Sequence, residues 1–220
     1  MKRTIEVISL VLVFYCSPGF AAEKTDTEDL TRMFLSVQQN DMDLFKQLLD
    51  DGVDPSALAH GESFKFTSFC ESTKPGNEEY FELIVAEGAR LENPGKYINN
   101  WGSPLLCAIA YKNFFVYERL IALGVDVNAV QNPKVTRKKS LRRPLSYTLL
   151  SNRIDFAWDI IQRIEVSEDQ IRRMVRYVEG NPGYEDNPQQ VYRQQIIQWL
   201  IDRGVEVNPS IPGVPYRKTQ

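Results

Sequence analysis

Residues 102–128 read GSPLLCAIAYKNFFVYERLIALGVDVN, and this stretch decides the fold. Ser103 is a favourable N-cap because its hydroxyl can accept a backbone N–H that has no partner inside a helix, and Pro104 suits the first helical position. Asn113 is expected to break this first helix, and Gly124 can adopt the left-handed conformation that ends a second one. The apolar residues at helical spacing are Leu105, Ala108 and Ile109 in the first helix, then Val116, Tyr117, Leu120 and Ile121 in the second.

Copies of the second helix occur along the whole chain. The glycines that follow them are Gly52, Gly88, Gly124 and Gly204, at intervals of 36, 36 and 80 residues. Because 80 is twice 40, the spacing predicts a degenerate copy near position 164, the fourth of five in chain order, and FAWDIIQRIEV indeed holds Ile164 at the glycine position. In all five copies the positions eight, seven, four and three before this anchor are apolar: Leu44, Phe45, Leu48, Leu49; Tyr80, Phe81, Ile84, Val85; Val116, Tyr117, Leu120, Ile121; Phe156, Ala157, Ile160, Ile161; Ile196, Ile197, Leu200, Ile201.

The repeated unit resembles an ankyrin repeat. SPLLCAIA, from residue 103, is similar to the TPLHxA start of that repeat, and LIALGVDVN, from residue 120, is similar to its end. The resemblance extends over roughly residues 28–212. It implies an all-α fold, an α-solenoid of about five ankyrin-like helix-turn-helix repeats with short β-hairpin fingers, each repeat burying its apolar face only against its neighbours. We expect an ankyrin-repeat domain over 22–212 and a C-terminal tail over 213–220.

The other repeats depart from this pattern in detail. The first begins near Glu28 and lacks the SP start, as a capping repeat often does. The second is expected to use Ser63 as its cap, with Phe64, Phe66 and Phe69 in the core. The fourth opens with RPLSYTLL, where Pro144 and Leu145 match the SPL start. The fifth starts at Glu168 and is interrupted by the Pro/Gly-rich segment GNPGYEDNPQQ.

The N-terminus has the pattern of a secretory signal peptide over residues 1–21. A positive start precedes a short apolar run, and small residues favour cleavage after Ala21 or Ala22. An uncleaved anchor or a buried N-terminal strand is the alternative. The bulky Tyr15 before Cys16 argues against lipidation. Because the signal resembles a bacterial one, we expect a periplasmic or secreted protein.

Composition limits the classes of partner. The formal charge is −3, and residues 1–21 contribute +1, so the remainder carries −4, which argues against a dedicated nucleic-acid binder. No second apolar run is long enough to span a bilayer, so we expect no membrane insertion after cleavage of the signal peptide. We also expect the protein to be a monomer. Cys70 and Cys107 lie in first helices of neighbouring repeats, where they could form a disulfide or remain two buried thiols.

Two linkers hold the candidate partner-binding residues. The resemblance places the segment with Tyr97 and Trp101 in a finger beside the concave face, where the aromatics would anchor a partner or pack on the next finger. The linker NPKVTRKKSLRR is strongly basic and would meet an acidic protein surface or remain a solvated loop. The candidate partner-binding set is Tyr97, Trp101, Arg137, Lys138, Lys139 and Arg142.

The sequence shows little that resembles catalytic chemistry. His60 is the one histidine, and no spacing suits zinc, a phosphate loop or a nucleophile elbow. We therefore expect no cofactor, no metal and no enzymatic activity, with a carboxylate-only hydrolytic enzyme as the alternative and a purely structural role third. The resemblance to secreted bacterial ankyrin proteins implies protein–protein interaction in the periplasm, either as an immunity protein or inhibitor for a toxin or as an envelope scaffold.

Overall fold

A computed structural model describes residues 27–57, 67–91, 103–129, 143–181 and 187–208 of the chain. These ranges form ten α-helices and no strand, which agrees with the all-α class. The helices are α1 (Thr27–Gln39), α2 (Met42–Asp50), α3 (Ser68–Ser72), α4 (Glu78–Ala86), α5 (Pro104–Tyr111), α6 (Phe114–Ala122), α7 (Pro144–Leu150), α8 (Ile154–Arg163), α9 (Glu168–Gly180) and α10 (Gln190–Ile201). None of the helices in these ranges has the length and apolar character needed to cross a membrane.

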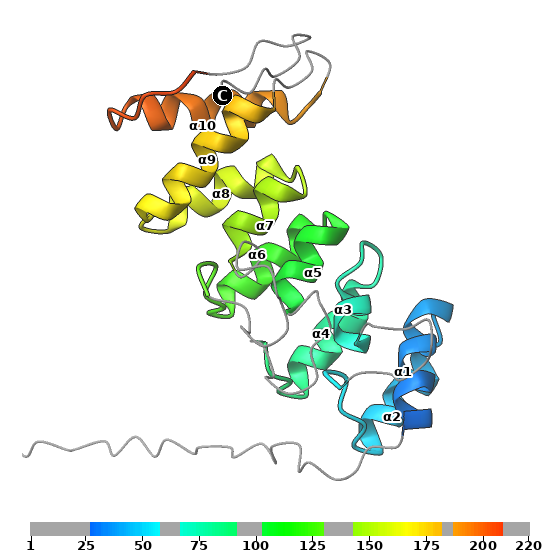
Figure 1. The fold of residues 1–220 in the computed structure, drawn as a ribbon. Helices are drawn as coiled ribbons and strands as arrows, with labels where there is room; N and C mark the ends of the chain where they lie inside the picture. Colours follow the sequence, from blue (N-terminus) through cyan, green and yellow to red (C-terminus); the bar gives the residue numbers. More distant parts are fainter. Residues whose placement is uncertain (1–26, 58–66, 92–102, 130–142, 182–186, 209–220) are drawn as a thin grey trace, which may run out of the picture.

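The helices are arranged as five consecutive pairs. Within each pair the two helices contact each other, and the first helices also contact one another in the order α1, α3, α5, α7, α9. Figure 1 shows the pairs following one another in sequence order along an elongated molecule. The two linkers expected to form fingers lie almost entirely outside the described residues, in 92–102 and 130–142, and the expected signal peptide and C-terminal tail lie outside them as well.

The third pair confirms the predicted helix start and the predicted break. Ser103 is the N-cap of α5, and its hydroxyl accepts the Leu106 N–H at 3.3 Å, with Pro104 at the start of the helix. Asn113 lies between α5 and α6, and its side-chain oxygen accepts the Val116 N–H at 3.2 Å and so begins α6. The left-handed residue that ends α5 is Lys112, with φ 61°.

The second pair starts later than the sequence suggested. Thr67, not Ser63, is the N-cap of α3, because its hydroxyl accepts the Cys70 N–H at 3.0 Å. The residues from Ser63 to Phe66 lie outside the described ranges, so the expected packing of Phe64 and Phe66 is not described. Phe69 is buried as predicted.

Four second helices end in the same way, at the four anchor glycines. Their φ angles are +82° at Gly52, +76° at Gly88, +92° at Gly124 and +71° at Gly204. After α6, the Gly124 N–H donates to the Ile121 carbonyl at 2.9 Å, and the next N–H, from Val125, donates to the Leu120 carbonyl at 3.1 Å. This pair of bonds is a Schellman motif, and α2, α4 and α10 repeat it. In the degenerate copy, Ile164 stands at the glycine position with an extended backbone, at φ −121°. The helix α8 therefore ends without a left-handed residue there.

The apolar positions of the repeat form one continuous core. The positions seven and four before the anchor are buried in all five copies: Phe45, Leu48, Phe81, Ile84, Tyr117, Leu120, Ala157, Ile160, Ile197 and Leu200. The copy predicted from spacing alone is therefore a genuine helix of the core, since Ile160 is fully buried in α8. The residues three positions before the anchor are less uniformly buried. Ile201 is 50% exposed, contrary to expectation, because α10 is the last described helix and no further described helix covers that side.

Candidate binding face

The residues predicted to contact a partner lie outside the described part of the chain. They are Tyr97, Trp101, Arg137, Lys138, Lys139 and Arg142, and His60 is also outside it. The ends of the basic segment are nevertheless described. The Arg143 guanidinium donates to the main-chain and side-chain oxygens of Asn128, at 2.7 and 2.9 Å, and Gln170 on α9 donates to the same side chain at 3.1 Å. The two ends of the segment are thus tied together and to the fifth pair.

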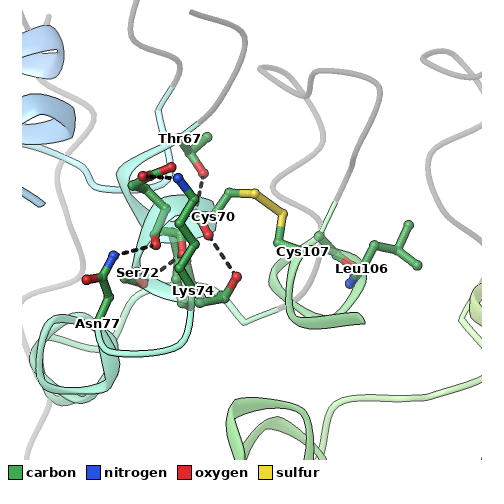
Figure 2. Close-up of a disulfide and its surroundings, with 11 residues drawn as sticks. Thr67, Cys70, Ser72, Lys74, Asn77, Leu106 and Cys107 are labelled. Atoms are coloured by element: carbon green, nitrogen blue, oxygen red, sulfur yellow. Dashed lines mark hydrogen bonds and ion pairs between the residues drawn. A yellow bond between two sulfur atoms is a disulfide. The ribbon is translucent and has the colours of Figure 1, made fainter. Parts of the chain in front are cut away.

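The structure joins Cys70 on α3 to Cys107 on α5 by a disulfide, as Figure 2 shows. Their Cα atoms are 5.5 Å apart, and both residues are buried. Cys70 is the third residue after its N-cap and Cys107 is the fourth, so the bridge runs diagonally between neighbouring first helices. Of the two alternatives that the sequence left open, the structure contains the bridge.

A charged and aromatic cluster lies in the same region. Glu71 is almost fully buried and forms an ion pair with Lys74 on the same turn. The Lys74 ammonium lies 5.1 Å from the ring centroid of Tyr111 on α5, a cation–π geometry. Burial raises the pKa of Tyr111 to about 12, with smaller contributions from Glu71 and from Tyr147 on α7. Glu71 on α3, Lys74 just after α3 and Tyr111 on α5 therefore form one cluster, with Tyr147 on α7 near enough to influence Tyr111 electrostatically.

A groove of about 380 Å³ lies between α7 and α9. We call it the α7–α9 groove; it is lined by Ser146, Leu149, Leu150, Arg173, Arg176, Tyr177 and Asn181. Leu150 is 64% exposed, whereas its neighbour Leu149 is buried. The Tyr177 hydroxyl donates to Asn152 at 2.6 Å, and burial raises the pKa of Tyr177 to about 12.

The lining of this groove contains two arginines. Arg173 pairs with Asp169 at 2.8 Å, but Arg176 has no ion pair within the described ranges. Behind Tyr177, Arg193 is buried at 3% exposure, and burial lowers the pKa of its guanidinium. Among the described residues, no group of three or more histidine, cysteine or acidic side chains is placed to hold a metal ion.

Comparison with models of known protein families and with curated proteins finds no match to the chain. The candidate binding face therefore follows from the geometry alone: the cluster of Lys74, Tyr111 and Tyr147, continued by the α7–α9 groove. The sequence did not predict these residues as a binding face, because its candidate partner-binding residues all lie in the two linkers. A signal was present, since tyrosines stand in three successive first helices, and Arg173 and Arg176 are three residues apart on the polar side of α9.

Proposed function

We propose that the chain is an exported protein–protein interaction module built from five ankyrin-like repeats with hairpin fingers. Support for the repeat architecture comes from the five helix pairs, the successive contacts of the first helices and the four identical Schellman ends. Support for fingers comes from the tied ends of the basic segment, where Arg143 bonds to Asn128. Repeat arrays of this kind present extended surfaces that suit a protein partner.

The observation that carries the binding function is the candidate binding face. Tyr111, Tyr147 and Tyr177 lie on three successive first helices, Lys74 lies just after the end of the preceding one, and a groove with two arginines adjoins the last tyrosine. Tyrosine and arginine are enriched at the energetic centres of protein interfaces, because they bury large areas and also form hydrogen bonds. A single small-molecule pocket would not need a face that extends over several repeats.

The proposed location is the bacterial periplasm. The expected signal peptide over 1–21 directs export, and the Cys70–Cys107 disulfide suits an oxidising compartment. In that compartment the protein would act either as an immunity protein that occludes a toxin or as a scaffold for an envelope enzyme.

The two linkers would act with the candidate binding face. The basic segment with Arg137, Lys138 and Lys139 would speed the encounter with an acidic partner surface, because opposite charges steer association. Tyr97 and Trp101 would hold the complex once it has formed, because aromatic anchors mainly slow dissociation.

Co-purification from the periplasm tests this function. We expect a stoichiometric complex with one protein that persists in size-exclusion chromatography and yields a saturable binding isotherm. Absence of any stoichiometric partner, together with turnover of a small substrate, would overturn the proposal and select the carboxylate-only hydrolytic enzyme.

Charge-reversal variants then locate the contacts of that partner. Replacing Arg137, Lys138 and Lys139 by Glu should slow association and reduce its salt dependence, and Trp101→Ala should mainly raise the dissociation rate. Reversing Arg90, an exposed residue after α4 that lies outside the linkers and the α7–α9 groove, is a surface control. Unchanged kinetics in both linker variants would assign binding to the candidate binding face alone.

A further inference from the structure

The α7–α9 groove combines an apolar wall with an excess of positive charge. Leu150 is a large apolar side chain, 64% exposed, and it stands beside a hollow of about 380 Å³ rather than on a flat surface. Leu149 and Tyr177 continue the apolar lining. A hollow of this size accepts one or two side chains of a bound segment, because ligand pockets begin at roughly 300 Å³.

Within the described residues, the charge of the groove is only partly balanced by ion pairs. Asp169 contacts Arg173 at 2.8 Å and is shared with Arg172 at 3.7 Å. Arg176 has no ion pair within the described ranges, although the whole chain carries a formal charge of −3. A cation left exposed beside an apolar hollow is complementary to a ligand that carries a carboxylate next to an apolar group.

The walls of the groove are already fixed in place. The Tyr177 hydroxyl is held by Asn152 at 2.6 Å, and the Asn181 amide donates to the Tyr177 carbonyl at 2.9 Å. Ser146 is buried in α7. A segment that enters the groove would therefore need to order the exposed side chains of Arg176 and Leu150 but not that of Tyr177, which lowers the entropic cost of binding.

We propose that the α7–α9 groove binds an acidic segment of the protein partner, with a carboxylate of that segment paired to Arg176 and an adjacent aliphatic or aromatic side chain packed on Leu150 and Tyr177. This inference rests on the proposed function and gives the chemistry of the partner at one place on the candidate binding face.

Short peptides test the chemistry directly on the full chain. The probe is acetyl-Leu-Glu-Leu-amide, titrated into the ¹⁵N-labelled protein and followed by NMR. We expect saturable shifts concentrated at Ser146, Leu149, Leu150, Tyr177 and Asn181. Acetyl-Leu-Gln-Leu-amide, which lacks only the charge, and acetyl-Gly-Glu-Gly-amide, which lacks the apolar groups, should each bind about tenfold more weakly or worse. Equal binding of the glutamine peptide, or no saturable shift, would overturn the proposal.

Variants separate the groove from general electrostatics. Arg176→Glu and Leu150→Ser should each weaken the binding of the glutamate peptide by about tenfold or more, because each removes one half of the recognition. Arg90→Glu changes the net charge by the same amount as Arg176→Glu, but Arg90 is an exposed residue after α4 and outside the groove lining, so this reversal should leave binding unchanged. Equal effects of the two reversals would reduce the site to non-specific attraction and refute it.

The two proposals can fail separately. A stoichiometric partner whose affinity is unaffected by Arg176→Glu and Leu150→Ser would refute the groove while leaving the interaction function intact. Specific peptide binding in a protein that yields no stoichiometric partner would refute the proposed function and leave the groove chemistry standing.

Discussion

The hydroxyl of Tyr117 donates a hydrogen bond of 2.6 Å to Oδ2 of Asp159, and this bond connects α6 to α8. Tyr117 is fully buried, and burial together with this bond raises the pKa of its phenol far above the usual range. Arg163 extends the link, because it pairs with Asp159 at 2.7 Å and with Glu118 at 2.6 Å. The third and fourth pairs are therefore joined by polar contacts as well as by the core.

Removing the Tyr117 hydroxyl should destabilise the protein. Tyr117→Phe keeps the ring packing but leaves Asp159 with one donor fewer, so we expect the free energy of unfolding to fall by about 1–3 kcal/mol. Urea denaturation followed by circular dichroism measures it. Tyr192→Phe is the control, because the Tyr192 hydroxyl has no hydrogen bond to another described residue, and it should cost under about 0.5 kcal/mol. Equal losses in the two variants would contradict the role of the bond.

Alkaline pH should destabilise the fold above pH 10. Burial raises the pKa values of Tyr111, Tyr147 and Tyr177 to about 12, whereas unfolded tyrosine titrates near about 10. The unfolded chain then loses these protons first, so their contribution to stability is complete below pH 10 and is lost as the pH rises toward 12. Unfolding free energies at pH 9 and 11, with tyrosinate absorbance of the native protein, measure the effect. Native tyrosines that all titrate near pH 10 would disprove it.

The anchor glycines should resist substitution for a conformational reason. A Cβ at Gly124 would meet no atom within 4 Å, so the cost of Gly124→Ala comes from its φ of +92° and should be about 1–2 kcal/mol. Gly180 also has open space around it but no positive φ, so Gly180→Ala should be neutral or stabilising by up to about 1 kcal/mol. Thermal denaturation of the two variants gives the comparison, and similar losses would argue against the strain.

The degenerate fourth copy should contribute to stability like the regular ones. Ile160→Ala removes a fully buried side chain of α8 and should lower the free energy of unfolding by about 2–5 kcal/mol. Ile201→Ala makes the same chemical change at a residue that is 50% exposed, and should cost under about 1 kcal/mol. Denaturant titration distinguishes them, and a loss at Ile160 as small as that at Ile201 would mean that α8 is misplaced.

The disulfide should be detectable and stabilising. Without reductant, alkylation followed by intact-mass measurement of the periplasmic protein should leave Cys70 and Cys107 unmodified. Replacing both bridged cysteines by Ser should lower the free energy of unfolding by about 2–4 kcal/mol, because the bridge restricts the unfolded chain. Labelling of Cys70 and Cys107 before reduction would exclude the bridge.

Local features of the fold could be predicted because they depend on neighbouring residues. The cap at Ser103 and the left-handed turn at Gly124 each involve bonds within five residues, so the sequence around them determines them. The fourth copy was predicted from spacing, since helical geometry fixes which side chains share a face. The error in the second repeat was also local: Thr67 rather than Ser63 begins α3, because both residues are suited to cap a helix and the backbone conformation decides which one does.

Contacts between helices could not be read from the sequence in this way. The sulfur atoms of Cys70 and Cys107 meet although the two residues differ by one position in the repeat, because the rotation and shift of α5 against α3 bring them together. The same holds for the α7–α9 groove, whose lining comes from residues 146–150 and 173–181. Periodicity determines which face of each helix is buried. Which side chains of different helices meet depends on how those faces pack, and only the tertiary structure decides that.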